Sequence, residues 1–274
     1  MRPVASRIDK QLRIAAAVTT VLPCGAEPTA IRTALRTVLP DPPRRVNRMI
    51  ELALLGAHRC LHGRIADSHC PLYLAVTHGS IADNVHLVSG VSSTGAPPMP
   101  VGFINLSSNM AGFYVASTLG VHGSNQALAS GELSFEAALE LVGLGRERRS
   151  QALIGAVEEC GWPLAEHRER LALPAGVPLV EASHWLFVDA DCQQPLATVQ
   201  WVRRFRSLAA AQAAVALESL PEGTVREVDG ALDGMHSGQR GAYRICRFIE
   251  AGAAPALLHV AGDDRAAYAV LVTR

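Results

Sequence analysis

The stretch from residue 120 to residue 159 constrains the fold of this chain more than any other segment. Residues 125–130 are short and weakly polar, and Gly131 then permits a sharp turn of the backbone. Apolar side chains follow at helical spacing, at Leu133, Ala137, Ala138 and Leu141. The helix is expected to end near residues 143–145, and residues 152–157 form an apolar run typical of a buried strand. The segment therefore predicts a strand, a tight turn, a helix and a second strand.

The residue that follows Gly131 in this turn is Glu132. Its side chain is expected at the N-terminal end of a buried helix, where the helix dipole favours a thiolate or a carboxylate. Glu132 can therefore be a structural anion at the start of the helix or a functional group, and the residue pattern leaves both roles open.

The order of these elements resembles the nucleophile region of the β-ketoacyl synthases, which are enzymes of the thiolase fold. In that family a Gly-Pro pair, a strand, a Cys on a sharp turn, a helix ending in Gly and an apolar strand follow one another. Placing Gly123 and Ser124 on the Gly-Pro pair, and Ala138 and Leu139 on the family's Ala-Leu, needs no gap. The resemblance then puts Glu132 at the position of the catalytic Cys.

A second resemblance lies upstream of this unit. Residues 72–76 read as a buried strand, and the loop at residues 77–80 is similar to the family's Ser-x-x-Gly-Glu loop. Residues 92–112 resemble the motif Ser-Pro-x-x-Phe-x-x-Ser-x-x-Asn-x-x-x-Gly, which in the family leads into a helix packed at the dimer interface. The two matches together cover residues 72–159, and residues 178–188 are similar to a further strand of the family.

The resemblance implies an α/β fold of the thiolase type, with helices and sheets layered in the order αβαβα and with two related halves. We expect residues 1–274 to form a single β-ketoacyl synthase-like domain. Its N-terminal half is expected over residues 1–165, and a shortened C-terminal half over residues 175–274. A weak duplication of this kind is expected to be invisible as sequence identity, and no internal repeat is visible here.

Several other segments carry local structural signals. Residues 44–61 have the apolar spacing of an amphipathic helix, and residues 14–22 read as a buried strand or helix. Residues 208–220 form an Ala-rich stretch that predicts a helix stopped by Pro221. Residues 241–274 read as a helix followed by two strands, which is similar to the end of the synthases.

The resemblance also indicates which catalytic groups are missing. A ketosynthase needs a thiolate to carry the acyl chain and two His side chains that stabilise the enolate formed on decarboxylation. Glu132 replaces the Cys, and no Thr-His-Gly-Thr loop occurs between Glu218 and Gly234. Alignment of the second His motif puts Met235 at the His position, with His236 one residue later. We therefore expect no catalytic residue in this chain, unless a shift of one residue restores His236.

A dead site on a dimerising scaffold resembles the chain length factor, the Cys-less homologue that pairs with an active ketosynthase in type II polyketide systems. The upstream motif is similar to that of ketosynthase-like proteins from aryl polyene pigment pathways. The resemblance implies a heterodimer with an active β-ketoacyl synthase, a contribution to that partner's acyl tunnel, and only indirect contact with acyl carrier protein. The residues expected at the tunnel and dimer interface are Asn109, Gly112, Phe113, Ser130, Gly131, Glu132 and Phe135.

Two other functions stay open. Homologues with Gln at the Cys position decarboxylate malonyl thioesters, and Glu132 is chemically close to Gln, although that reaction uses the two His side chains. The chain could instead be a homodimeric acyl or carrier-protein binding module outside any synthase complex. A binding module predicts a stable homodimer when expressed alone, whereas a subunit predicts an exposed apolar face and poor solubility without its partner.

Composition narrows the class of protein. The chain has 274 residues, of which 49 % are hydrophobic, so it can bury a sizeable core. Lys and Arg number 25, and so do Asp and Glu, and this balance offers no basic surface to a nucleic acid backbone. No apolar run reaches the roughly 20 residues of a membrane-spanning helix. We expect a cytoplasmic protein that neither binds nucleic acid nor spans a membrane.

The cysteines and histidines carry no metal-binding pattern. The six cysteines are scattered without a Cys-x-x-Cys pair, at positions 24, 60, 70, 160, 192 and 246. This scatter favours reduced thiols in a cytosol over a disulfide framework or a zinc site, and Cys160 is expected to be a buried, inert thiol. His78, His122 and His184 lack metal-ligand spacing, so each is expected to be a loop or core histidine. We expect neither a metal nor a cofactor.

Overall fold

The computed structural model describes residues 4–8, 10–25, 27–95, 103–145, 150–161, 163–170, 172–174, 176–228 and 240–274. Met235 and His236 lie outside these residues. The strands are β1 (Val4–Ile8), β2 (Leu12–Pro23), β3 (Leu72–Ala75), β4 (Asn125–Leu128), β5 (Gln151–Glu158), β6 (Val180–Asp189), β7 (Ala197–Phe205), β8 (Val225–Val228), β9 (Ala256–Gly262) and β10 (Ala267–Thr273). The helices are α1 (Pro28–Val38), α2 (Arg48–Cys60), α3 (Ile81–Thr94), α5 (Ser108–Leu119), α6 (Ser134–Leu144), α7 (Leu164–Arg170), α8 (Leu208–Val215) and α9 (Arg240–Ala251), with a 3₁₀ turn, η1, at Gly131–Leu133.

A mixed sheet of ten strands runs through the described part of the chain. Its order is β4-β3-β5-β6-β2-β7-β10-β9-β8, with β1 paired to β7. The long strand β2 pairs with β7 through residues 12–14 and with β6 through residues 14–23, so it joins two portions of the sheet. The sheet thus continues through both halves expected from the sequence, while the half boundaries and the contraction of the second half stay predictions.

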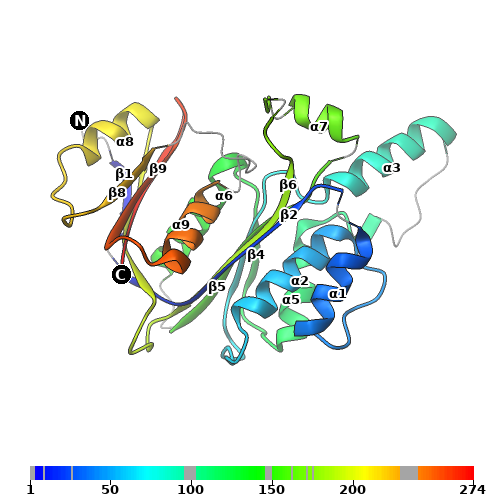
Figure 1. The fold of residues 1–274 in the computed structure, drawn as a ribbon, viewed down its shortest axis with the longest axis horizontal. Coiled ribbons are helices and arrows are strands. Elements are labelled where there is room, and N and C mark those ends of the chain that lie inside the picture. The colour runs from blue at the N-terminus through cyan, green and yellow to red at the C-terminus, as the bar shows by residue number, and fades with distance from the viewer. Residues whose placement is uncertain are drawn as a thin grey trace.

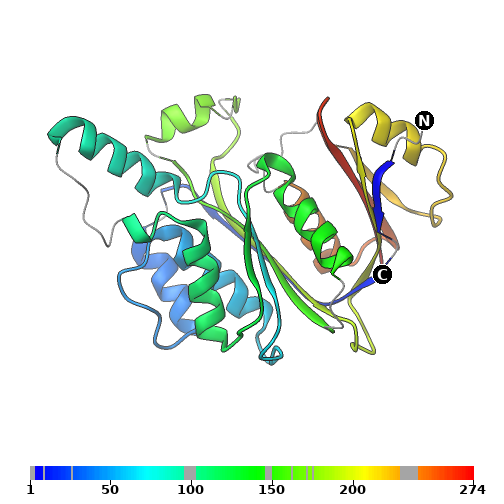
Figure 2. The ribbon, with the colours of Figure 1, turned by 180° about the vertical axis from the view of Figure 1, so that it is seen from behind.

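The helices divide into an inner layer and two outer layers. α6 and α9 lie between the two portions of the sheet and contact strands of both (Figures 1 and 2). α1, α2 and α5 lie outside the portion formed by β3, β4, β5 and β6, and α8 lies outside the portion formed by β7, β9 and β10 (Figure 1). This arrangement confirms the expected thiolase-like order αβαβα.

The unit that the sequence predicts around Gly131 is confirmed. β3 runs parallel to both β4 and β5, and η1 and α6 connect β4 to β5. Gly131 has a φ of 65°, a left-handed conformation that glycine adopts without the steric cost that other residues meet. α6 ends at Leu144, where the sequence predicts the end of the helix.

The inner helices are held by apolar side chains that face both portions of the sheet. α6 contributes Phe135, Ala138, Leu139 and Val142 to one core cluster, and α9 contributes Ala242, Ile245, Cys246 and Ile249. A helix enclosed on two faces is apolar around most of its circumference, which explains why residues 133–144 read as a buried helix. On the other face of the sheet, α1, α2 and α5 pack through a second cluster, which includes Leu52, Leu55, Val115 and Trp185, and α8 packs through a third with Ala211 and Val215.

The other local predictions are confirmed with shifts at the element ends. The amphipathic helix is α2, and its N-cap Asn47 accepts a hydrogen bond from the Ile50 amide at 3.0 Å. Residues 14–22 belong to a strand, β2. The Ala-rich helix α8 ends at Val215, before Pro221, and Leu217 just beyond it is exposed. The sequence analysis did not anticipate β1, α3, α7 or β8.

One expectation about the cysteines is wrong. Cys24, just after β2, and Cys160, just after β5, form a disulfide with a Cα–Cα separation of 5.9 Å. The two cysteines lie 136 positions apart in the sequence, so no spacing signal pointed to the pair. Cys60, Cys70, Cys192 and Cys246 are free thiols, and burial raises the pKa of Cys60 to about 12, as expected for an inert core residue.

None of the helices in the described ranges has both the length and the apolar character needed to cross a lipid bilayer.

Candidate functional site

The carboxyl ends of three parallel strands meet at one edge of the sheet. Ser130, Gly131 and Glu132 follow β4, the loop at residues 77–80 follows β3, and Glu158 ends β5. In open α/β sheets this edge is where ligands and catalytic groups gather. Ser130, Gly131 and Glu132, which the sequence analysis assigns to the site, therefore lie at this edge. All three are exposed.

The turn after β4 is fixed by Ser134, the first residue of α6. The Ser134 hydroxyl accepts a hydrogen bond from the Ser130 amide at 2.9 Å. It lies 2.9 Å from the Val76 carbonyl oxygen and 2.6 Å from the Gly131 carbonyl oxygen, to which it can donate. These contacts tie the turn to the end of β3 and leave the Glu132 side chain pointing outward, with 54 % of it exposed.

Three glutamates spaced four residues apart place their side chains on one face of the helical segment from residue 132 to residue 140. Each meets a partner from the last 35 residues of the chain. Glu132 Oε2 lies 3.3 Å from Arg240 Nη2, Glu136 Oε1 lies 2.8 Å from His259 Nε2, and Glu140 Oε2 accepts a hydrogen bond from the Tyr268 hydroxyl at 2.6 Å. We call these pairs Glu132–Arg240, Glu136–His259 and Glu140–Tyr268 the glutamate ladder.

The second and third pairs of the ladder are closed to solvent. Glu136 and His259 are buried, and within the described part of the chain Glu136 Oε2 and His259 Nδ1 have no hydrogen-bond partner. A Cβ atom at Gly241 would collide with Glu136 Oε1 and lie 2.9 Å from His259 Nε2, so the backbone of α9 approaches this pair too closely for a side chain. Burial and the hydrogen bond to Glu140 raise the pKa of Tyr268 above its ordinary value.

The first pair of the ladder determines what the turn can do chemically. A carboxylate stands against a guanidinium at the end of α6, and an ion pair of this kind carries no nucleophilic thiol. Acyl transfer to Glu132 would give an anhydride, which is too labile to act as an acyl carrier. The turn therefore presents an ion pair at the position where the resemblance places a thiol.

A second polar cluster at the same edge was missed by the sequence analysis. The Glu158 carboxylate accepts hydrogen bonds from the Thr77 and His78 amides, both at 2.9 Å, and its Oε1 lies 2.7 Å from His78 Nδ1. The neighbouring Glu159 accepts a hydrogen bond from the Ala82 amide, and burial raises its pKa to about 8. Because 80 positions separate His78 from Glu158, only the parallel pairing of β3 and β5 brings them together.

The other two histidines behave as the sequence analysis expects. His122 is exposed in the loop before β4. His184 is fully buried in β6, and burial lowers its pKa to about 3. Among the residues that the structure describes, no group of three or more His, Cys, Asp or Glu side chains is arranged to hold a metal ion.

The surface beside the turn has an unpaired strand edge and an exposed aromatic side chain. In the described part of the sheet β4 has a neighbour on one side only, and α5 packs on it so closely that a Cβ atom at Gly112 would collide with Asn125. Phe113 on α5 is 54 % exposed. The nearby α3 buries none of its side chains and projects from the body of the molecule (Figures 1 and 2).

The structure thus separates the expected interface residues into two groups. Asn109, Phe113, Ser130, Gly131 and Glu132 are exposed, and Gly112 lies beneath them at the contact between α5 and β4. Phe135 is fully buried in the inner layer, because it projects from α6 toward the sheet instead of the surface.

The fold defines the class of protein: it is the thiolase-type fold that solved ketosynthases and chain length factors share. The chain is similar to the ishigamide ketosynthase/chain length factor, with a TM-score of 0.64 and 21 % identity, over 87 % of this chain and 84 % of that one. It is also similar to a type II polyketide synthase acyl-carrier protein in complex with its ketosynthase, AntDE:AntF, with a TM-score of 0.74 and 11 % identity, over 96 % and 99 %. A third likeness is to the ketosynthase ApeO in complex with its chain length factor ApeC from Xenorhabdus doucetiae, with a TM-score of 0.56 and 12 % identity, over 97 % and 100 %.

No family model and no curated protein sequence matches this chain. At identities this low the structural similarities establish the fold alone.

Proposed function

We propose that this chain is a non-catalytic, ketosynthase-like subunit of the chain length factor type, which forms a heterodimer with an active β-ketoacyl-ACP synthase. The observation that carries the proposal is the Glu132–Arg240 ion pair at the turn after β4, where the resemblance requires a thiol. A scaffold that keeps the strand, turn and helix of a ketosynthase but not its nucleophile is suited to support a second, active subunit.

The surface beside the turn supports heterodimer formation. The outer edge of β4 offers backbone donors and acceptors that a strand of another chain can pair with. Next to it, Phe113 is an exposed aromatic side chain of the type that anchors protein interfaces. Phe103 and Ile104, 62 % and 52 % exposed, precede α5 and add to the apolar surface that a partner would cover.

Tunnel shaping is the finer part of the proposal. Asn109, Phe113 and Glu132 are exposed beside the β4 edge, so a partner docked there would place its acyl tunnel against these side chains. Their size and charge would then limit the length of the growing chain. We propose a type II polyketide system of the aryl polyene pigment class as the setting, with acyl carrier protein bound mainly by the active subunit.

Co-expression with a complete ketosynthase tests the heterodimer. Size-exclusion chromatography with mass determination is expected to give a one-to-one complex that extends a malonyl-carrier substrate only when the partner's Cys is intact. Phe113→Glu is expected to abolish the complex, because it places an uncompensated charge in the interface. Ile65→Glu is the matched control, since Ile65 is 93 % exposed in the loop before β3, and it is expected to leave the complex intact.

The same complex tests the role of Glu132. Glu132→Ala is expected to leave the complex able to extend its substrate, with an unchanged or altered product length, because the proposal assigns no chemistry to the carboxylate. A stable homodimer that ignores the ketosynthase would contradict the proposal and favour a binding module. Release of carbon dioxide from malonyl thioesters by this chain alone would contradict it in favour of a decarboxylase.

A further inference from the structure

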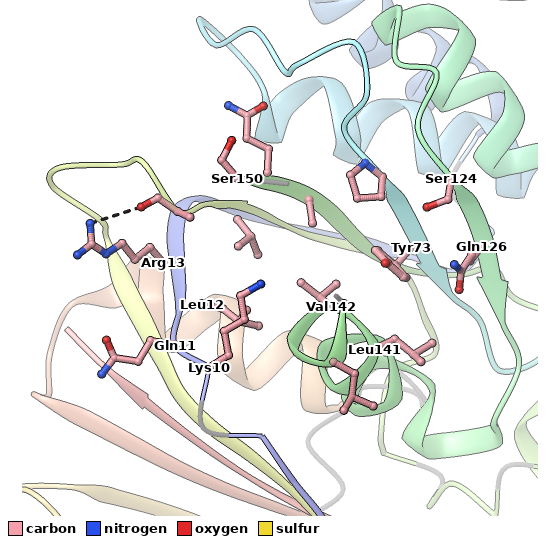
Figure 3. Close-up of a pocket in the computed structure, with 17 residues that line it drawn as sticks. Lys10, Gln11, Leu12, Arg13, Tyr73, Ser124, Gln126, Leu141, Val142 and Ser150 are labelled. Atoms are coloured by element: carbon pink, nitrogen blue, oxygen red, sulfur yellow. Dashed lines mark hydrogen bonds between the residues drawn. The ribbon is translucent and has the colours of Figure 1, made fainter. Parts of the chain in front are cut away.

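A cleft of about 450 Å³ lies at the amino ends of β3, β4 and β5, at the opposite end of these strands from Glu132 (Figure 3). Strands of the sheet and the last turn of α6 form its walls. Its larger apolar lining residues include Leu12, Tyr73, Leu141, Val142, Leu144 and Val188. The volume is within the range of roughly 300 to 1,000 Å³ that is usual for small-molecule sites.

The leucines at the end of α6 are exposed to this cleft. Leu141 and Leu144 are 38 % and 53 % exposed, although α6 is otherwise an enclosed helix. Apolar side chains left open in a concave surface gain free energy when an apolar ligand covers them. The cleft therefore favours a ligand with a hydrocarbon portion.

Among the residues that the structure describes, the charged side chains that line the cleft are the cations Lys10 and Arg13, and no Asp or Glu lines it. The Arg13 guanidinium is directed to the rim, where Nη1 lies 3.3 Å from the Cys192 carbonyl oxygen. The Lys10 amino group points into the open space above Leu12 (Figure 3), and it has no ion-pair or hydrogen-bond partner among the described residues. This unpaired ammonium would attract an anionic head group.

We propose that this cleft binds an acyl chain that ends in a carboxylate or a phosphate, with the chain against Leu141, Val142 and Leu144 and the head group at Lys10. The site is separate from the Glu132 turn, because the full length of the parallel strands lies between them.

Isothermal titration calorimetry on the purified chain tests the site with two anionic probes, decanoate and decyl phosphate, each below its micelle concentration. We expect saturable binding of one molecule per chain for at least one probe, and the tighter probe identifies the head group. Shortening that probe from ten carbons to eight is expected to weaken binding about fifteenfold, since each buried methylene contributes about fourfold. Decyltrimethylammonium, with the same chain and the opposite charge, is expected not to bind.

Variants separate a defined site from general detergent-like adsorption. Lys10→Glu is expected to weaken binding by about tenfold or more, because it removes the charge-assisted contact and adds a repulsive charge. Leu144→Asp is expected to remove the dependence of the binding affinity on the length of the probe's hydrocarbon chain. Arg226→Glu, an exposed reversal on the distant strand β8, is the matched control and is expected to have no effect.

Circular dichroism confirms that the compared variants are folded. The proposal is overturned if neither anion binds saturably, if decyltrimethylammonium binds as well as the anions, or if Arg226→Glu weakens binding as much as Lys10→Glu.

Discussion

The first two glutamates of the glutamate ladder share a helix face but differ in environment. Glu132 is 54 % exposed and meets Arg240, whose side chain is 13 % exposed, whereas Glu136, one turn further along, is buried with His259 in the inner layer. The same residue type thus forms an ion pair with a half-exposed carboxylate in one place and an enclosed contact in the next. Water reaches the first carboxylate and screens it in part, while the second lies where an unpaired carboxylate is expensive.

This difference indicates how the chain divides its tasks. The buried pairs join α6 to β9 and β10, elements that are more than 100 residues later in the sequence, and so hold the two portions of the sheet around the inner helices. The exposed pair contributes little to that assembly. Position 132 is therefore open to change for function, while positions 136 and 259 are fixed by stability.

The largest expected effect comes from breaking the buried pair. His259→Ala removes the only partner that the described residues provide for the Glu136 carboxylate, and we expect unfolding to become easier by about 3 to 5 kcal/mol. Urea denaturation followed by circular dichroism measures this change. His259→Gln supplies a hydrogen-bond donor to Glu136 and is expected to lose less stability than His259→Ala. A loss as small as that of an exposed ion pair would show that the first and second pairs of the ladder contribute equally to stability.

The next effect tests how tightly the backbone of α9 closes over that pair. Gly241→Ala would bring a methyl group against Glu136 Oε1 and His259 Nε2, and we expect a destabilisation of about 1 to 3 kcal/mol. Gly90→Ala, in α3, is the matched control because nothing lies within 4 Å of the position that its new methyl group would take. It is expected to stabilise by about 0.4 to 1 kcal/mol, through helix propensity and a less flexible unfolded chain. Equal effects of the two substitutions would contradict close packing at Gly241.

The third pair of the ladder gives a pH-dependent prediction. Tyr268→Phe removes the hydroxyl that donates to Glu140 and is expected to cost about 1 kcal/mol at pH 8. The pKa of Tyr268 is raised in the folded state, so the unfolded chain ionises first, near pH 10, and ionisation then favours unfolding. The wild type should lose stability above about pH 10 while the variant lacks this loss. The difference in free energy of unfolding between wild type and variant, measured by denaturation, should therefore be smaller at pH 10.5 than at pH 8. An equal difference at the two pH values would contradict the raised pKa of Tyr268.

The smallest expected effect is at the exposed end. Glu132→Ala should change the free energy of unfolding by less than about 1 kcal/mol, because the Glu132 carboxylate is half-exposed and water screens its 3.3 Å contact with Arg240 in part. Glu222→Ala, at an exposed position between α8 and β8, provides the baseline for the same substitution without an ion pair. If Glu132→Ala destabilised the chain as strongly as His259→Ala, Glu132 would be a structural anchor instead of a replaceable surface residue.

The parts of this structure that depend on local pattern could be read from the sequence. Gly131 and the apolar spacing after it predict β4, the turn and α6, since a left-handed turn and a buried helix each leave a local signature. The resemblance of the same residues to a nucleophile region then placed Glu132 at the turn.

Contacts between distant residues could not be read in this way. His259 and Tyr268 have no local signal that identifies Glu136 and Glu140 as partners, and the Cys24–Cys160 disulfide likewise depends on where β2 and β5 end. The position of Phe135 could not be read from the sequence either. It is adjacent to the turn in sequence, but the helical rotation of α6 directs its side chain into the core instead of toward the expected interface.

The glutamate ladder also has an evolutionary consequence. Losing either Glu136 or His259 alone leaves the other buried polar side chain without its partner, whereas replacing both with apolar residues can leave stability unchanged. Substitutions at these two positions are thus expected to be accepted together during divergence, and a side chain at position 241 to be tolerated only after both have changed. Position 132, free of this coupling, can change on its own, so its variation among relatives would record selection by the proposed partner instead of by the fold.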